Sequence, residues 1–219
     1  DWADTGNITR MDAMFIYTPV FNQSVAGFDT SSCTNFSNMF NSCFSFNQPL
    51  VTSGSNLDMS SATTVAGMFG STDVFNQDLS SWDLSEVTTM QAMFRGADVF
   101  NNGGVPLSWT TTNKLEDMYR MFQGALLFNA DVSSWDTSGV TSMRETFQSC
   151  EAFNNGGAEL TWNTSSVENF NETFEGCHVF NNGEAPGAST TPLNWITTAA
   201  TNMSFMFADC TSFNQSLNS

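Results

Sequence analysis

The chain has 219 residues, of which 40% are hydrophobic and only 12% are charged, and 22 acidic residues against 5 basic ones give a net charge of −17. This balance argues against nucleic acid as a partner, because nothing in the chain would neutralise phosphates, and it opposes docking on anionic lipid. No apolar run approaches the roughly 18 residues that a membrane helix needs, so we expect no membrane-spanning segment.

A single repeat array is predicted over residues 1–219. The dipeptide Phe-Asn occurs eight times, and another phenylalanine lies six residues before the phenylalanine of each dipeptide. We call these the first and second phenylalanine of a repeat. The first ones are Phe15, Phe40, Phe69, Phe94, Phe122, Phe147, Phe174 and Phe207, and the second ones are Phe21, Phe46, Phe75, Phe100, Phe128, Phe153, Phe180 and Phe213. Invariant spacing in about eight units predicts a solenoid.

Each repeat is predicted to begin with a short strand. A large apolar residue, tryptophan in six repeats, precedes the first phenylalanine by 12 or 13 residues. In residues 79–85 the alternation of apolar and polar residues places Trp82 and Leu84 on one strand face. The opposite face carries Ser81, Asp83 and Ser85, and the matching row of a later repeat is Ser134, Asp136 and Ser138. We take these two rows as the candidate binding residues.

A short helix is predicted to follow each strand. In residues 140–153, apolar or small residues recur at offsets 0, 3, 6, 7, 10 and 13, which trace one face of a helix. Eleven of the twelve methionines precede a first phenylalanine by one or four residues, and Met59 is the exception. Such a stripe is either a Met-rich binding groove or the stacked core of the array. The invariant spacing favours the core.

The repeat resembles a known family. The pattern Val-x-x-Met-x-x-Met-Phe-x-x-Ala/Cys-x-x-Phe-Asn, followed by Leu-x-x-Trp-Asp, is similar to the repeat of BspA-like leucine-rich-repeat surface proteins and covers essentially the whole chain. The resemblance implies an α/β solenoid of leucine-rich-repeat type, with a parallel sheet of short strands on one face and short helices on the other. It also implies secreted or cell-surface proteins that act in adhesion and recognition without catalysis.

Two further columns of the repeat have structural interpretations. The asparagine after each second phenylalanine is predicted to satisfy backbone groups and to stack on its neighbours, since a buried polar group in every repeat must be paired. Four of the five cysteines share a column of small residues, three after the first phenylalanine. We expect free thiols. A disulfide needs Cα atoms within about 7 Å, whereas neighbouring helices pack roughly 8–10 Å apart.

Asp29, Asp58 and Asp83 each follow the large apolar residue of neighbouring repeats. Stacked carboxylates at this spacing would repel one another, so they either cap backbone amides or hold calcium through oxygen ligands. Capping is favoured, because no known calcium motif is present, and we therefore expect no cofactor. Of seven Asn-x-Ser/Thr sequons, Asn171 is the best candidate for glycosylation in a eukaryote.

The junctions between repeats alternate in length. From a second phenylalanine to the next large apolar residue they span 7, 11, 7, 9, 7, 9 and 15 residues, and three long ones begin with Asn-Asn-Gly. The alternation favours a periodic contact over tolerated insertion only slightly. No polar caps flank the array, so we expect further repeats or other copies at both ends.

These observations predict a non-enzymatic extracellular or cell-surface protein that binds proteins or glycans. The alternative is a structural subunit of an extracellular filament, appendage or coat, in which copies of the chain contact one another. Catalysis is disfavoured because the chain has a single histidine, His178, scattered carboxylates, and no nucleophile with a base.

Overall fold

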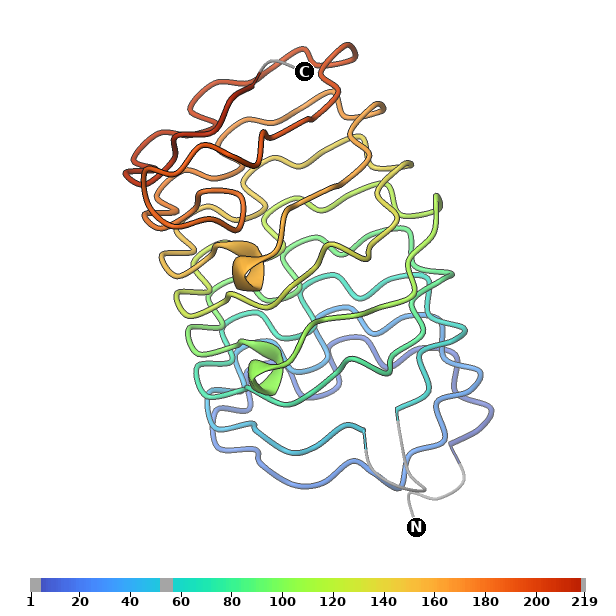
Figure 1. Cartoon of the computed structure of the whole chain (residues 1–219). Helices are drawn as coiled ribbons and strands as arrows, with labels where there is room; N and C mark the ends of the chain where they lie inside the picture. Colours follow the sequence, from blue (N-terminus) through green and yellow to red (C-terminus); the bar gives the residue numbers. More distant parts are fainter. Residues whose placement is uncertain (1–4, 52–56, 218–219) are drawn as a thin grey trace.

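The structure, a computed structural model, describes residues 5–51 and 57–217. The chain winds into a stack of similar turns that runs from the N-terminus at one end to the C-terminus at the other (Figure 1). We call each turn a rung and number it by its first phenylalanine, so that rung 1 contains Phe15 and rung 8 contains Phe207.

Regular secondary structure is almost absent from the described residues. The only helices there are two short 3-10 turns, η1 (Asn102–Gly104) and η2 (Asn155–Gly157). Isolated parallel bridges take the place of a sheet. One chain of bridges joins Arg10, Asn35, Thr64, Thr89, Asp117, Ser142, Asn169 and Asn202, one residue in each rung. The predicted α/β solenoid of leucine-rich-repeat type, with a parallel sheet and short helices, is therefore wrong.

Left-handed residues explain why the predicted helices do not form. In every rung the second residue before the first phenylalanine and the second residue after it have positive φ. In rung 6 these are Glu145, at φ 55°, and Ser149, at φ 59°. A left-handed residue on every fourth position cannot be part of a right-handed helix. The segment is instead a series of tight turns, whose buried residues happen to recur at helical spacing.

Backbone hydrogen bonds alternate between two directions in these turns. Within rung 6, the Thr146 N–H donates to the Met143 carbonyl at 3.1 Å, and the Cys150 N–H donates to the Phe147 carbonyl at 2.9 Å. The Phe147 N–H points along the stack instead and donates to the Thr173 carbonyl of rung 7 at 2.9 Å. This division pairs the buried amides without a sheet.

The phenylalanines form a continuous aromatic ladder. Phe94 and Phe100 of rung 4 stack with ring centroids 3.8 Å apart, and Phe94 lies 5.5 Å from Phe122 of rung 5. Phe94 and Phe147 are fully buried, so the core interpretation of the Met-Phe stripe is confirmed. Aromatic residues bury large apolar areas and favour such offset stacking. We call this side of the stack, with its phenylalanine, asparagine and small-residue columns, the Phe wall.

The asparagine column of the Phe wall is a hydrogen-bonded ladder, as predicted. The Asn129 N–H donates to Oδ1 of Asn101 at 2.7 Å, and the Asn154 N–H donates to Oδ1 of Asn129 at 2.7 Å. The same bond recurs at all seven steps from Asn22 to Asn214. Each rung therefore fixes the turn of the next.

The five cysteines are free thiols, as predicted. The Cys150 thiol donates to the Phe122 carbonyl at 2.9 Å, and the Cys177 thiol donates to the Phe147 carbonyl at 3.0 Å. Burial raises the pKa of both thiols far above the ordinary value, and it raises the pKa of Cys210 to about 12. These thiols are packing residues rather than nucleophiles.

The second asparagine of each Asn-Asn-Gly junction accepts a backbone N–H of the preceding rung and so binds the two rungs together. In η1, the fully buried Asn102 accepts the Leu79 N–H at 2.8 Å through Oδ1, and its Nδ2 donates to the Pro106 carbonyl at 3.0 Å. In η2, Asn155 accepts the Val132 N–H in the same way at 2.9 Å. The long junctions thus have an internal structural role, which accounts for their regular recurrence.

Candidate binding site

The face opposite the Phe wall carries the tryptophan column and a threonine column, and we call it the Trp wall. Trp109 and Trp135 stack with ring centroids 5.2 Å apart. The Trp109 indole N–H donates to the Leu79 carbonyl at 2.8 Å, and the Trp135 indole N–H donates to the Leu107 carbonyl at 2.7 Å. Trp162 and Trp195 repeat this bond to the preceding rung. Each of these indoles therefore has a paired donor.

The threonine column lies ten residues before the first phenylalanine and ties neighbouring rungs together. The Thr30 hydroxyl donates to the Asp58 carbonyl at 3.0 Å, and the Thr137 hydroxyl donates to the Asn163 carbonyl at 2.9 Å. Six rungs have threonine here, and the two exceptions are Met59 in rung 3 and Leu84 in rung 4. Because neither side chain has a hydroxyl, rung 3 lacks this link to rung 4 at Met59, and rung 4 lacks it to rung 5 at Leu84.

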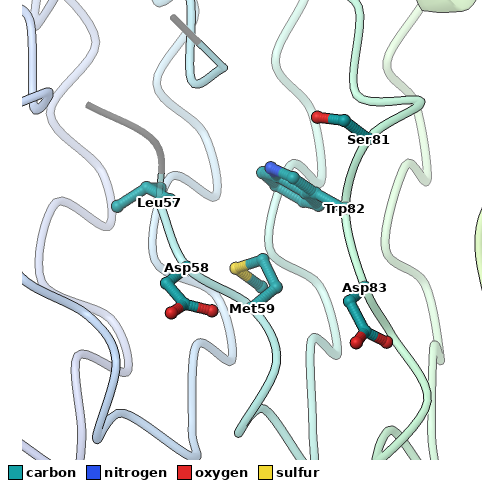
Figure 2. Close-up of a pocket in the computed structure, with 6 residues that line it drawn as sticks. All are labelled: Leu57, Asp58, Met59, Ser81, Trp82 and Asp83. Carbon is teal, nitrogen blue, oxygen red and sulfur yellow. The ribbon is translucent and has the colours of Figure 1, made fainter. Parts of the chain in front are cut away.

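A hollow opens where the threonine link is missing. Its volume is about 310 Å³, and its lining residues are Leu57, Asp58, Met59, Ser81, Trp82 and Asp83 (Figure 2). In Figure 2 the indole of Trp82 reaches from its own rung toward Leu57, and Met59 lies between the two aspartates. Met59 is the methionine that lies outside the two methionine columns. We call this site the Trp82 hollow.

The indole N–H of Trp82 has no hydrogen-bond partner among the described residues, although the nitrogen is buried and the residue is only 3% exposed. The four described tryptophans that follow it, Trp109, Trp135, Trp162 and Trp195, all donate to a carbonyl of the preceding rung. An unpaired buried donor costs about 1–3 kcal/mol, and such groups need an explanation. An acceptor from outside the described chain would remove this cost.

Two carboxylates flank the Trp82 hollow. Oδ1 of Asp58 accepts the Ser60 N–H at 2.9 Å and the Ser60 hydroxyl at 2.7 Å, and Oδ1 of Asp83 accepts the Ser85 N–H at 3.0 Å. These bonds orient both side chains through one oxygen. Oδ2 of each aspartate accepts no hydrogen bond within the described chain, so it is available to a ligand.

The two predicted binding rows have different surroundings. Ser81 and Asp83 are exposed at the Trp82 hollow, and Ser85 is half-buried. In the second row, Ser134 and Asp136 are exposed and Ser138 is half-buried, and none of the three lines the Trp82 hollow. The Ser138 hydroxyl donates to Asp136 at 2.6 Å, and this bond holds the pKa of Asp136 below its ordinary value. Of the two rows, only the first thus contributes residues to the Trp82 hollow.

The aspartates proposed for calcium act as caps. Asp29 accepts the Ser31 hydroxyl at 2.7 Å and the Ser31 N–H at 3.1 Å, and these bonds lower its pKa. Asp58 accepts the Ser60 N–H and hydroxyl in the same manner, whereas Asp83 accepts only the Ser85 N–H. Across residues 5–51 and 57–217, no three carboxylate, histidine or cysteine side chains come together as metal ligands. Each of the three aspartates thus caps the backbone N–H two residues on, and calcium binding by them stays a prediction.

Asn171 is half-buried, and its side-chain Nδ2 donates to the Ser204 carbonyl of rung 8 at 3.0 Å. This is the nitrogen that a glycan would modify, so glycosylation there would replace a bond between rungs 7 and 8. Asn171 stays a predicted acceptor.

A second polar cluster, on the outside of rungs 5 to 7, is largely paired internally, although Nε of Arg144 has no partner among the described residues. Burial alone would raise the pKa of Glu145, but Arg120 at 2.6 Å and Arg144 at 2.7 Å hold it below the ordinary value. The Arg120 guanidinium also lies 4.7 Å from the centroid of the Tyr119 ring. The cluster therefore links rungs and leaves little charge for a ligand.

Sequence reasoning missed the Trp82 hollow, although a signal was present. The repeat pattern includes Leu57 and Trp82 only as its large apolar residues and leaves Met59 as an exception, and it does not include the threonine column. Within that column, Met59 and Leu84 are two adjacent exceptions that mark the hollow.

In the described residues no helix is long and apolar enough to cross a membrane.

Comparison with known families gives one match. The model of the family described as "Mycoplasma protein of unknown function, DUF285" matches residues 1–107 and again residues 105–219. The two matches together cover the whole chain, so the chain belongs to this family. No curated protein and no solved structure matches the chain.

Proposed function

We propose that this member of the DUF285 family is a non-enzymatic recognition module outside the cell or at its surface, and that the Trp82 hollow binds a glycan. The buried indole N–H of Trp82, which lacks a partner among the described residues, carries the proposal. Trp82 lines a hollow that is flanked by Asp58 and Asp83. In each aspartate Oδ1 accepts a hydrogen bond, and Oδ2 accepts none within the described chain.

The chemistry of the hollow suits a polyhydroxylated ligand. Sugar hydroxyls donate to Oδ2 of Asp58 and of Asp83, and a small movement of the Trp82 ring that exposes its buried N–H lets a sugar oxygen accept that donor. Leu57 and Met59 line the hollow but are each only 2% exposed, so the contacts to a ligand come mainly from the exposed Asp58, Ser81 and Asp83. In Figure 2 the indole nitrogen and the carboxylates lie on opposite sides of the ring, so a ligand that meets both extends across it. This favours an oligosaccharide over a monosaccharide.

Charge narrows the class of glycan further. The chain has a net charge of −17, and Asp58 and Asp83 are both exposed beside the hollow. Anionic glycans are repelled by such a surface, while neutral or amino sugars are not. A neutral or cationic oligosaccharide is therefore the preferred ligand.

Binding without catalysis is supported by the state of the reactive side chains. The thiols of Cys150 and Cys177 are buried, and each donates to a carbonyl. The backbone carbonyl of the exposed His178 accepts the Ser212 N–H and the Thr211 hydroxyl. These groups therefore supply no activated nucleophile.

The test is a glycan-array screen of the chain, followed by calorimetry on the best neutral or amino-sugar oligosaccharide. Trp82→Phe keeps an aromatic ring but removes the N–H, and Asp83→Asn removes a charge without changing shape. We expect each variant to weaken binding at least tenfold. Binding in the presence of a calcium chelator should be unchanged.

Asp136→Asn is the matched control, because Asp136 occupies the position of Asp83 in another rung and does not line the Trp82 hollow. It should bind as the unmodified chain does. Equal losses from Asp136→Asn and Asp83→Asn, or full binding by Trp82→Phe, would contradict a site at the Trp82 hollow.

A further inference from the structure

Arg95 differs from the other four basic residues of the chain. Among the described residues it is the one basic side chain that forms no ion pair, although the chain has 22 acidic residues. The other pairs are Arg10 with Asp12, Lys114 with Glu86, and Arg120 and Arg144 with Glu145. In a chain with a net charge of −17, an unpaired guanidinium is an exception that needs an explanation.

Neighbouring side chains hold the Arg95 guanidinium in place. Its Nε donates to Oε1 of Gln123 at 2.8 Å. The Gln123 amide is anchored in turn, because its Nε2 donates to Oε2 of Glu145 at 2.7 Å and also to Oε1 of Gln148. The two terminal nitrogens of Arg95 bond to no described residue. They therefore present a fixed pair of donors, which is the geometry that matches a carboxylate.

Arg95 lines a hollow of about 390 Å³ on rungs 3 to 6, which we call the Arg95 hollow. Its other lining residues are Ser71, Gly96, Gln123, Gly124, Gln148 and Ser149. A second hollow, of about 370 Å³, continues from it toward rung 2, and Ser71 and Arg95 line both. Arg95 is the one charged residue that lines either hollow. A negative group placed there therefore meets a cation and no carboxylate.

Free hydroxyls lie at the two ends of the Arg95 hollow. Ser71, Gly96, Gly124 and Ser149 occupy the same position of rungs 3 to 6, two residues after the first phenylalanine. The hydroxyls of Ser71 and Ser149 bond to no described residue. The two glycines between them have no side chain to fill the space. Three rungs span roughly 15 Å at about 4.8 Å per rung, which is the length of about four extended residues.

We propose that the Arg95 hollow binds an extended peptide segment of another protein through one aspartate or glutamate side chain. The carboxylate of that side chain accepts both terminal nitrogens of Arg95. The hydroxyls of Ser71 and Ser149 bond to peptide groups on either side of it, because a hydroxyl can pair with an N–H or with a carbonyl.

The lining favours a peptide over an acidic sugar. No apolar or aromatic side chain lines the Arg95 hollow, whereas Leu57, Met59 and Trp82 line the Trp82 hollow. A sugar ring would therefore have no apolar surface to lie against, while an extended backbone needs only polar partners. The net charge of −17 repels a polyanion, so the segment has one acidic residue among neutral ones. The two hollows share no lining residue, so this site does not rest on glycan binding.

The test is a selection from a library of acetylated and amidated nonapeptides on the immobilised chain, followed by fluorescence polarisation with the best peptide. We expect the selected peptides to share one aspartate or glutamate, and its amide form should bind at least tenfold more weakly. Arg95→Gln should cause a similar loss. This variant should fold, because Gln123 and Gln148 occupy the same position of the next two rungs. The two losses should not add, since both remove the same ion pair.

Two matched pairs of variants separate this site from general charge and packing effects. Lys114→Gln removes the same charge outside the Arg95 hollow and should bind the peptide normally. Gly96→Ser fills the hollow and should weaken binding at least fivefold. Serine already has φ 53° at Ser71 and φ 59° at Ser149, so the backbone accepts it there. Gly176→Ser is the control for this change, because Gly176 occupies the same position in rung 7, outside the hollow.

Three results would overturn the proposal: selected peptides without an acidic residue, fully additive losses, or an equal effect of Lys114→Gln. An oligogalacturonate that binds the unmodified chain but not Arg95→Gln, with no peptide selected, would show an acidic glycan to be the ligand instead. Arg95→Gln should leave oligosaccharide binding at the Trp82 hollow unchanged, so the two sites are tested separately.

Discussion

The two walls of the stack differ in how strictly they repeat. The Phe wall has the same phenylalanines and the same asparagine in all eight rungs, and Asn22 through Asn214 form one unbroken ladder. The Trp wall repeats in most rungs but changes at Met59 and Leu84, and the Trp82 hollow opens there. Positions that are the same in every rung, such as the asparagine column, bond each rung to the next. Where the threonine column is interrupted at Met59, such a bond is lost and the Trp82 hollow opens.

Truncating the Phe wall should have the largest effect. Phe94→Ala removes a fully buried ring that stacks on Phe100 and Phe122, and it should lower the free energy of unfolding by about 3–5 kcal/mol. Chemical denaturation measures this. Leu127→Ala, at an exposed position, should change it little. If Phe94→Ala unfolded at the same midpoint as the unmodified chain, the Phe wall would not be the stabilising side.

Alkaline pH should weaken the Phe wall next. Burial raises the pKa of Cys150 and Cys177 above the ordinary value of 9.0, so the folded chain keeps protons that the unfolded chain loses. Stability is therefore constant below about pH 9 and falls above it, by about 1.4 kcal/mol per pH unit for each thiol.

The double variant Cys150→Ala/Cys177→Ala is the control for this slope, since rungs 4 and 5 already have alanine at this position. Denaturation curves at several pH values above 9 should be flatter for it than for the unmodified chain. Identical slopes would show that other groups cause the alkaline loss.

Removing one step of the asparagine ladder should cost less. Oδ1 of Asn129 accepts the Asn154 N–H at 2.7 Å and the Gly156 N–H at 3.0 Å. Asn129→Ala leaves both amides without this acceptor, and it should destabilise the chain by about 1–3 kcal/mol. Asn113→Ala, at an exposed turn, is the comparison that should show no effect in the same denaturation experiment.

The smallest effect should distinguish two tryptophans of the Trp wall. Trp109→Phe leaves the Leu79 carbonyl without its 2.8 Å donor. The indole N–H of Trp82 has no partner to lose among the described residues. We therefore expect Trp109→Phe to lower the free energy of unfolding by about 1 kcal/mol more than Trp82→Phe does. Thermal unfolding of the two variants measures the difference. A larger loss for Trp82→Phe would mean that its N–H is paired in solution.

Much of the packing was predictable from spacing alone. The burial of Phe94 and Phe147, the asparagine ladder and the outward position of Asp83 all follow from an invariant repeat, because stacking neighbours must bury the same face in each unit. The local backbone was not predictable in this way. A spacing of three and four residues fits a helix, and it also fits successive tight turns.

A local signal for the turns was nevertheless present in the glycines. Gly67, Gly96, Gly124 and Gly176 all lie two residues from a first phenylalanine, and all have positive φ. Glycine at a fixed place in several repeats indicates a left-handed position rather than a helix interior. The remaining left-handed positions have serine, asparagine, alanine, charged or, at Tyr17 and Phe205, aromatic residues, which hides the pattern. The Trp82 hollow was missed because it depends on two exceptions in a threonine column.

The division of hydrogen bonds within and between rungs has a mechanical consequence. Because each rung is held mainly by the two beside it, a force applied between the chain ends would detach rungs one at a time, starting from the ends. Successive first phenylalanines are 25 to 33 residues apart. Each release would lengthen the chain by roughly 80–120 Å at about 3.3–3.6 Å per residue. The molecule would behave as an extensible tether that yields in steps and absorbs work at each one.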